Sequence, residues 1–246
     1  MTDELQGRVA LVTGAAGGMG MAICRRLMEA GAHVVATDLQ QDRELGDGAT
    51  YVAGDIADPD HVMAVVAKAV ALHGRLDCAV NAAGIEFETV PLAECADDDF
   101  DRMMNVNTKG VFLSMKYELR AMIKAGNGGS IVNIASTNSF RPQHNQPAYT
   151  ASKHAVLGLT RSAAIDYARK NIRVNCVVPG AINTPMLHNA MDRRNRTADD
   201  VASRLSQFGR FGEPGEIANA VMFLCSDASS FTTGHALSVD GGMLAG

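Results

Sequence analysis

Three residues in the middle of the chain have the types and spacing of an acid–base site. Tyr149 and Lys153 lie four positions apart, so on a helix they share one face, and Ser136 lies thirteen residues before Tyr149. A free tyrosine titrates at about 10, so a phenolate near pH 7 needs roughly 4 kcal/mol of differential stabilisation. A lysine charge roughly 4 Å away, at an effective dielectric of about 20, provides about that much. The positive end of a helix that begins near Ala148 also favours the phenolate.

A glycine-rich segment near the N-terminus predicts a dinucleotide site. A tyrosine and a lysine at this spacing occur on many surface helices, so the second motif is needed to support a catalytic interpretation of the pair. Gly14, Gly18 and Gly20 follow an apolar strand and open a helix, whose free N–H groups and dipole favour a pyrophosphate. Asp38 ends the next strand, where a carboxylate hydrogen-bonds the ribose hydroxyls and repels a 2′-phosphate. Its neighbours are uncharged: Thr37, Leu39 and Gln40. The cofactor expected is therefore NAD rather than NADP.

Composition excludes several classes of protein. The 246 residues are 47% hydrophobic, enough for a sizeable core, and a formal charge of -5 argues against a nucleic-acid surface. Five widely spaced cysteines without a CxxC motif indicate buried thiols in a reducing cytoplasm. No apolar run approaches 18 residues and no basic segment precedes the first one, so we expect neither export nor membrane insertion. The histidines lack the spacing of metal ligands, and we expect no metal site.

Short apolar runs alternate with longer amphipathic segments along the whole chain. The strands expected are 8–12, 33–38, 51–53, 78–81, 130–134, 173–178 and 236–239. The helices expected are 18–30, 59–73, 96–104, 107–125, 148–169 and 214–226. Strands separated by helices of this length form right-handed crossovers. The sequence thus predicts an α/β fold of the doubly wound Rossmann type, with about seven parallel strands and helices on both faces. Because no linker interrupts the pattern, we expect one domain over residues 1–246.

Six motifs stand in the order and spacing of a known family. They are TGxxxGxG at 13–20, NAAG at 81–84, VN at 106–107, Ser136, YxxxK at 149–153 and PG at 179–180. In these motifs the chain resembles the short, single-domain, NAD-type members of the short-chain dehydrogenase/reductase family over nearly its whole length. One departure is Ala82, where the family has a second asparagine in NNAG. Since the first one is retained as Asn81, we expect altered packing there rather than lost activity.

The resemblance implies a catalytic role for four residues. Tyr149 would be the general acid/base, and Lys153 would lower its pKa and hold the nicotinamide ribose. Ser136 would hydrogen-bond the substrate oxygen. Asn107 would steady the active-site helix and a proton-relaying water. The expected reaction interconverts a secondary alcohol and a ketone, with hydride passing to or from the nicotinamide.

The resemblance also implies the cofactor residues. Asp55 would accept from the adenine amino group, although it is also a plausible turn residue, and Ile56 would pack on the ring. Ile182 and Thr184 would lie near the carboxamide. The full set is Gly14, Gly18, Met19, Gly20, Asp38, Leu39, Asp55, Ile56, Asn81, Ala82, Gly84, Tyr149, Lys153, Pro179, Gly180, Ile182 and Thr184.

The substrate is less well defined by the sequence. Residues 185–212 resemble the family's variable loop over the active site, and their apolar side chains at helical spacing face either the substrate or the core. The rim expected is polar, and consists of Glu86, Asn138, His144, Asn145 and Gln146. Such a rim favours a hydroxylated ring, a sugar or a diol over a bare acyl chain.

Two other functions and an assembly remain open. A 3-oxoacyl-[acyl-carrier-protein] reductase shares the motifs, but such enzymes usually use NADP, against which Asp38 argues. A non-catalytic NAD-binding regulator would not need all of Asn107, Ser136, Tyr149 and Lys153. The two helices that follow Asn107 and Ala148 resemble the family's dimer surface, and the C-terminal segment resembles that of tetrameric members, so we expect a homotetramer.

Overall fold

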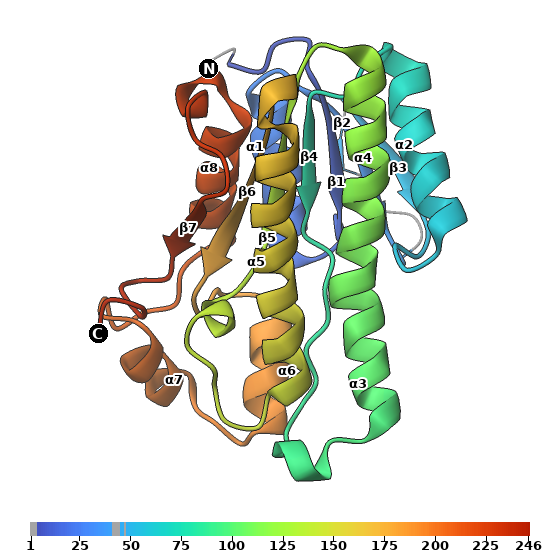
Figure 1. The fold of residues 1–246 in the computed structure, drawn as a ribbon. Coiled ribbons are helices and arrows are strands. Elements are labelled where there is room, and N and C mark those ends of the chain that lie inside the picture. The colour runs from blue at the N-terminus through green and yellow to red at the C-terminus, as the bar shows by residue number, and fades with distance from the viewer. Residues whose placement is uncertain (1–3, 41–44, 47) are drawn as a thin grey trace.

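A parallel sheet of seven strands forms the centre of the molecule (Figure 1). The computed structural model describes residues 4–40, 45–46 and 48–246. The strand order is β3-β2-β1-β4-β5-β6-β7, and every pairing of neighbours is parallel. The strands are β1 (Val9–Thr13), β2 (His33–Asp38), β3 (Ala49–Ala53), β4 (Cys78–Asn81), β5 (Gly129–Ile134), β6 (Ile172–Pro179) and β7 (Ala236–Val239). This confirms the predicted doubly wound sheet.

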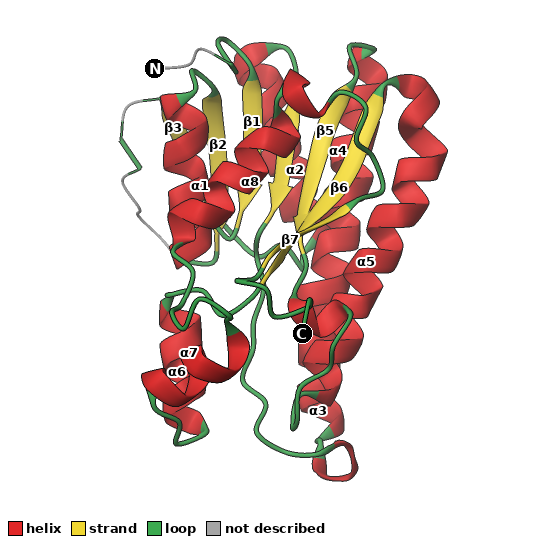
Figure 2. Ribbon diagram, turned by 90° about the vertical axis from the view of Figure 1, so that its left-hand side faces the viewer, coloured by secondary structure: helices red, strands yellow, loops and turns green. Residues whose placement is uncertain are grey.

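Helices cover both faces of the sheet (Figure 2). On one face α1 (Gly18–Glu29) and α8 (Pro214–Cys225) pack on the strands, and on the other face α2 (Pro59–His73), α4 (Val111–Ala125) and α5 (Pro147–Tyr167) do so. Because β1 is buried on both faces, its sequence VALVT is apolar almost throughout. Within the described ranges, the helices are all too short or too polar to cross a bilayer.

The topology predicts where a ligand binds. Strands β1 to β3 progress toward one edge of the sheet, whereas β4 to β7 progress toward the other, so the direction of winding reverses between β1 and β4. In open α/β sheets the crevice at the carboxyl ends of the strands beside such a reversal is the usual binding site. The glycine-rich loop follows β1, residues 82–84 follow β4 and Ser136 follows β5. All three motifs therefore lie at the carboxyl ends of these strands.

Two helices lie beyond the carboxyl ends of the strands, in the segment 185–212 that the resemblance described as a variable loop. They are α6 (Pro185–Arg193) and α7 (Ala198–Leu205) (Figures 1 and 2). Each starts at a threonine whose hydroxyl accepts a backbone N–H: Thr184 accepts from Leu187, and Thr197 from Asp200, both at 3.3 Å. These N-caps are local signals that an assignment of the whole segment to a loop overlooks.

The two helices expected at 96–104 and 107–125 are joined without a break. α3 (Asp97–Met104) passes through a π-helical turn, Asn105–Gly110, directly into α4. No proline interrupts the stretch, and its widened turn adds a residue without ending the helix. The expected gap between the helices was therefore wrong. The turn carries Asn107, which is fully buried.

A carboxyl group lies in the core against the sheet. Glu118 on α4 is 0% exposed, and its Oε2 accepts a hydrogen bond of 3.1 Å from Asn81 Nδ2 on β4. Its Oε1 has no partner in the described part of the chain. Burial raises the pKa of Glu118 to about 8, so the folded protein holds this group neutral at pH 7.

This raised pKa makes a prediction about stability. Between pH 4.5 and 8 the folded chain keeps a proton that the unfolded chain has released, so the free energy of unfolding should fall as pH rises, by up to about 1.4 kcal/mol per pH unit. Glu118→Gln should remove this component in urea unfolding at pH 5, 6, 7 and 8. Glu29→Gln, at an exposed position, serves as control. An equal pH dependence in wild type and Glu118→Gln would contradict the assignment.

Candidate active site

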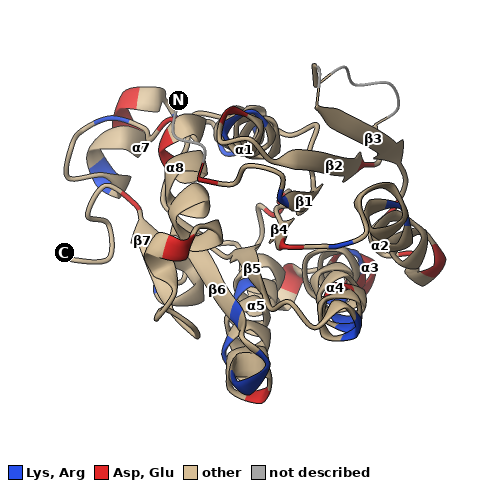
Figure 3. Ribbon diagram, turned by 90° about the horizontal axis from the view of Figure 1, so that it is seen from above, with Lys and Arg blue, Asp and Glu red and all other residues tan. Residues whose placement is uncertain are grey.

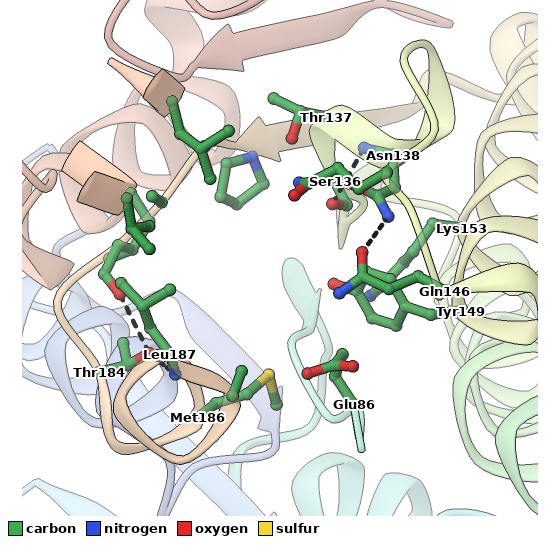
Figure 4. A pocket seen from close by; sticks show the side chains of 18 of the residues that line it. Glu86, Ser136, Thr137, Asn138, Gln146, Tyr149, Lys153, Thr184, Met186 and Leu187 are labelled. Carbon is green, nitrogen blue, oxygen red and sulfur yellow. Dashed lines mark hydrogen bonds between the residues drawn. The ribbon is translucent and has the colours of Figure 1, made fainter. Parts of the chain in front are cut away.

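A cavity of about 580 Å³ opens at the carboxyl ends of β4, β5 and β6 (Figure 4). Many of the residues expected from the sequence line it, which places the catalytic and substrate candidates in one site. They are Met19, Ala82, Gly84, Glu86, Ser136, Asn138, His144, Gln146, Tyr149, Lys153, Pro179, Gly180, Ile182 and Thr184.

Ser136, Tyr149 and Lys153 converge on this cavity. Ser136 follows β5, whereas Tyr149 and Lys153 lie on the first turns of α5. The Ser136 hydroxyl is close enough to the Tyr149 phenol to lower the pKa of Tyr149. The Lys153 ammonium lies 5.7 Å from the Tyr149 ring centroid and donates a hydrogen bond of 2.9 Å to the Ile134 carbonyl. The two side chains that meet substrate oxygen in the expected reaction are thus adjacent, with the ammonium beside them.

Burial opposes the phenolate that the sequence predicted at neutral pH. It raises the pKa of Tyr149 to about 12, and the Ser136 hydroxyl counteracts only part of this rise. Burial also lowers the pKa of Lys153 to about 8. A low-polarity environment disfavours the charged form of an acid and of a base alike. The expectation that Lys153 by itself brings Tyr149 to a neutral-pH phenolate was therefore wrong, because it ignored the cost of burying both groups.

Glu88 holds the start of the catalytic helix, a role that sequence reasoning missed. Glu88 is 4% exposed, and its carboxylate accepts hydrogen bonds from the N–H groups of Ala148, at 2.9 Å, and of Tyr149, at 2.7 Å. These are N–H groups that a helix start leaves unpaired, and the residue before α5, Gln146, offers no side-chain cap. The carboxylate of Glu88, rather than the phenolate of Tyr149, therefore occupies the positive end of α5. No local signal reveals a cap that lies sixty residues away.

The loop that carries Glu88 is also tied to α6. Arg194, which ends α6, forms an ion pair with Glu86 and donates a hydrogen bond of 2.6 Å to the Glu88 carbonyl. Arg193 donates to the Glu86 carbonyl at 2.7 Å and to its carboxylate at 3.4 Å. Glu86 is only 6% exposed in its side chain and points into the cavity (Figure 4). It thus faces the substrate space while holding the helix that covers it.

Asn107 lies behind the cavity wall rather than on it. Its amide bonds both backbone groups of Ile85, at 2.8 and 2.9 Å, and donates to the Ser152 hydroxyl on α5 at 3.2 Å. A Cβ added to Gly84 would lie 3.3 Å from Asn107 Oδ1 and 3.6 Å from Lys153 Nζ. Asn107 therefore fixes the loop after β4 against α5, close to Lys153.

The expected polar rim is only partly available to a substrate. Asn138 Nδ2 donates to Gln146 Oε1 at 2.7 Å (Figure 4), and Asn138 Oδ1 accepts from Gln143 at 3.1 Å. Gln146 is 8% exposed, and no partner of its amide nitrogen occurs among the described residues. His144 is exposed at the mouth. Asn145 is not among the lining residues and adopts a left-handed conformation with φ of 60°.

The apolar side chains of α6 and α7 face the cavity. Met186, Leu187 and Met191 line it from α6, and Leu205 lines it from α7. Phe208, another apolar residue of the segment 185–212, lies outside this cavity and is 75% exposed. Of the two orientations left open by the sequence, the structure favours the substrate-facing one for the two helices.

The N-terminus of α1 fits a dinucleotide pyrophosphate. Its N-cap is Gly17, which has no side chain to cap the helix, and its first turn contains no acidic residue. Asp58, Thr184, Thr197 and Glu88 cap α2, α6, α7 and α5, so α1 differs from these helices. A Cβ on Gly14, where φ is +69°, would lie 2.5 Å from the Ala83 nitrogen. Within the described part of the chain, no side chain caps the first turn of α1, which leaves its N–H groups for a phosphate.

Asp38 lies beside this loop at the end of β2. Its carboxylate accepts from the N–H of Ala16 at 3.1 Å and from that of Gln40 at 3.2 Å. Across the loop, Gly18 faces Thr184, whose Cγ2 would lie 3.0 Å from an added Cβ. The glycine-rich loop is therefore bordered by Asp38 on one side and by the start of α6 on the other. A nicotinamide dinucleotide fits these residues.

Other cofactor candidates lie away from the cavity wall. Asp55 Oδ1 accepts from the N–H of Ala57 at 2.8 Å, which is a local turn, and Ile56 is 6% exposed in a small core cluster. Asn81 is 1% exposed and links β4 to Asn133 of β5 at 2.9 Å. Leu39 is 64% exposed. The adenosine roles of these residues stay predictions.

Across residues 4–40, 45–46 and 48–246, no three histidine, cysteine or acidic side chains are grouped so that they could hold a metal ion. The five cysteines are free, and only Cys95 is not buried.

Comparison with known proteins identifies the family. A family model described as "Enoyl-(Acyl carrier protein) reductase" matches residues 14–244. A 2,5-dichloro-2,5-cyclohexadiene-1,4-diol dehydrogenase of Sphingobium indicum is 42% identical, over 99% of each chain. A cis-4-hydroxycyclohexanecarboxylate dehydrogenase of Sinomonas cyclohexanicum is 40% identical, over 100% of each chain. A short chain dehydrogenase/reductase of Aspergillus oryzae is 38% identical, over 98% of this chain and 96% of that protein.

Solved structures agree with the sequence relatives. The crystal structure of levodione reductase has a TM-score of 0.91 and is 34% identical, covering 98% of this chain and 99% of that one. ElxO with NADP bound also has a TM-score of 0.91 and is 33% identical, covering 97% and 99%. Together with the sheet order and the convergence of Ser136, Tyr149 and Lys153, these similarities show that the chain belongs to the short-chain dehydrogenase/reductase family.

Proposed function

We propose that this protein is an NAD(H)-dependent oxidoreductase that interconverts a secondary alcohol and a ketone on a hydroxylated ring or sugar-like substrate. The observation that carries the proposal is the meeting of Ser136, Tyr149 and Lys153 at one cavity that adjoins the uncapped start of α1. A proton-transfer group and a dinucleotide site at the same crevice are what such a reaction requires.

The residues divide the proton chemistry between them. Ser136 holds the substrate oxygen by a hydrogen bond, and Tyr149 takes the alcohol proton in oxidation or returns it in reduction. Lys153, fixed by the Ile134 carbonyl, retains N–H groups for the nicotinamide ribose. When bound, the nicotinamide accepts or supplies the hydride, and its oxidised form carries a positive charge that favours the phenolate. Acid–base help of this kind contributes about 10²- to 10⁴-fold to the rate.

NAD is the cofactor proposed, although a structural neighbour carries NADP. The support is Asp38, whose carboxylate is held by the N–H groups of Ala16 and Gln40 beside the glycine-rich loop. A negative charge fixed there repels the 2′-phosphate of NADP and hydrogen-bonds the free hydroxyls of NAD.

Asp38→Ala should therefore narrow the preference for NAD over NADP by about tenfold or more, mostly through a lower KM for NADP. Steady-state kinetics with both cofactors measures this ratio. Asp60→Ala, at an exposed position on α2, is a suitable control because it should leave the ratio unchanged. The same ratio in Asp38→Ala as in wild type would remove the ribose role.

The experiment that tests the function is cofactor-linked turnover across a panel of substrates. Relatives named for a cyclohexadiene diol and for a hydroxycyclohexanecarboxylate support starting with ring alcohols, followed by sugars, hydroxysteroids and hydroxyacyl thioesters. Turnover of none of them, with NAD or NADP, would contradict the proposal and favour the alternative of a non-catalytic NAD-binding regulator.

A 3-oxoacyl-[acyl-carrier-protein] reductase is the second candidate. A 3-oxoacyl-[acyl-carrier-protein] reductase of Thermotoga maritima, which is 39% identical over 98% of this chain and 99% of that protein, favours it. Such an enzyme would show its highest kcat/KM with an acyl-carrier substrate and NADPH. A clear preference for free ring alcohols and NAD would exclude it.

We also propose a homotetramer in the cytoplasm. Large apolar side chains remain exposed on the two helices expected to form the dimer surface: Phe112 is 47% exposed and Ile123 37% on α4, and Ile165 is 81% exposed on α5. The free thiols suit a reducing compartment. Light scattering that gives the mass of one 26.0 kDa chain would exclude the tetramer.

A further inference from the structure

Four arginines line the cavity, and the side chains of two of them have no partner among residues 4–40, 45–46 and 48–246. Arg194 is ion-paired with Glu86, and Arg141 Nη1 donates to the carbonyls of Met243 and Gly246 at 3.0 and 2.9 Å. The side chains of Arg196 and Arg204 line the same cavity, yet neither forms a hydrogen bond, an ion pair or a ring contact with any residue that the structure describes. Two guanidinium groups are therefore available to a ligand.

The position of Arg204 on α7 follows from the helical period. The cavity-lining residues of α7 are Asp200, Val201, Arg204 and Leu205, which form one face of the helix. The acid on this face, Asp200, accepts hydrogen bonds from the hydroxyl of Thr197 at 2.8 Å, as part of the helix cap. It forms no ion pair with Arg204. The exposed side chain of Arg204 thus has no carboxylate partner within the part of the chain that the structure describes.

The arginines and the catalytic side chains come from different sides of the site. Ser136 and Tyr149 belong to β5 and α5, whereas Arg196 precedes α7 and Arg204 lies on it, beyond the carboxyl edge of the sheet (Figure 1). Apolar side chains of α6, among them Leu187 and Met191, line the same cavity. A ligand that spans the cavity would therefore meet hydroxyl groups at one end, an apolar middle and cations at the other end.

We propose that the substrate carries a carboxylate, which Arg196 and Arg204 bind while its carbinol carbon faces Ser136 and Tyr149. This rests on the proposed function and specifies its substrate class. Guanidinium groups match the planar geometry of a carboxylate and form charge-assisted hydrogen bonds to it. An apolar ring between alcohol and carboxylate suits the lining of the wall.

An acidic carrier protein is a less suitable partner for these arginines. Arg196 and Arg204 are exposed residues that also line the cavity, and the surface around them alternates in sign because the acids Asp192 and Asp199 are exposed on the same segment. Figure 3 shows both signs on α7. A docking site for an acidic protein requires a surface of one sign.

The experiment compares a carboxylate with its uncharged counterpart. The substrates are 4-hydroxycyclohexanecarboxylate and 4-hydroxycyclohexanecarboxamide, which differ in charge and little in size. In Arg196→Gln/Arg204→Gln, KM for the carboxylate should rise about tenfold or more with kcat within a factor of two, while KM for the carboxamide stays unchanged. Arg204→Lys should retain part of the preference. Arg169→Gln, at an exposed position in the short helical turn just after α5, is the matched control.

Binding measurements separate this proposal from the reaction itself. Calorimetry with cyclohexanecarboxylate, which has no carbinol, should detect binding to wild type that weakens with salt and is lost in the double variant. That result would support the anion site even if neither alcohol is turned over. Equal KM values for the acid and the amide in wild type, equal effects of the double variant on both, or a loss confined to acyl-carrier substrates would overturn it.

Discussion

Replacing Tyr149 with phenylalanine is expected to lower turnover by about 10²- to 10⁴-fold while the affinity for NADH changes by less than about threefold. Phenylalanine keeps the ring and its position beside Lys153, but it removes the phenolic oxygen on which Ser136 acts. Since that oxygen is the only group proposed to exchange a proton with the substrate, the loss should appear in kcat. Steady-state kinetics and a fluorescence titration with NADH measure the two quantities.

Tyr167→Phe, on the same helix but at its far end, should leave both quantities unchanged. An active Tyr149→Phe enzyme would refute the acid–base assignment. The pH dependence adds a second check. Because burial places the pKa of Tyr149 well above neutrality, oxidation should accelerate with rising pH on the alkaline side of pH 7, as the phenolate fraction grows.

Replacing Glu88 with alanine is expected to lower kcat by about 10- to 100-fold, although Glu88 does not line the cavity. The N–H groups of Ala148 and Tyr149 would lose a buried, charged acceptor, and a displacement of the reacting group by about 1 Å costs on the order of 10² in rate. The free energy of unfolding should also fall by about 1.5–3 kcal/mol. Kinetics and urea unfolding on the same samples give both numbers.

A merely structural role of Glu88 would lower kcat only in proportion to the fraction of folded protein, whereas a positioning role predicts more. If Glu88 positions Tyr149, kcat falls more than the folded fraction does, KM for NADH stays within about twofold, and Glu88→Gln restores part of kcat because its amide oxygen still accepts a hydrogen bond. Glu94→Ala, an exposed acid in the same connection, is the control. A kcat that follows only the fraction of folded protein would contradict the positioning role.

The parts of the site that the sequence predicts are those whose partners are near in sequence or fixed by the fold. Tyr149 and Lys153 are one helical turn apart, and Gly14 and Asp38 occupy the ends of adjacent strands, so spacing and topology suffice to place them. Glu88 lies outside such reasoning, because its partners are reached only when the loop after β4 meets the start of α5.

Burial is the other property that spacing does not reveal. Glu118 would be assigned to a solvated helix face by its charge, yet it is 0% exposed against β4. The same lack of information explains the wrong direction expected for the pKa of Tyr149. A motif reveals the nearby ammonium group, which lowers the pKa of Tyr149. The desolvation that raises this pKa depends on residues from several distant elements.

The loop that contains Glu86 and Glu88 holds both the end of α6 and the start of α5. Arg193 and Arg194 at the end of α6 attach to it, and the first N–H groups of α5 attach to it as well. The segment 185–212 over the cavity and the helix that carries Tyr149 thus share one anchor. During evolution, substrate preference can therefore drift through the cavity-facing residues of α6 and α7 without displacing the base, provided that this pair of arginines is preserved.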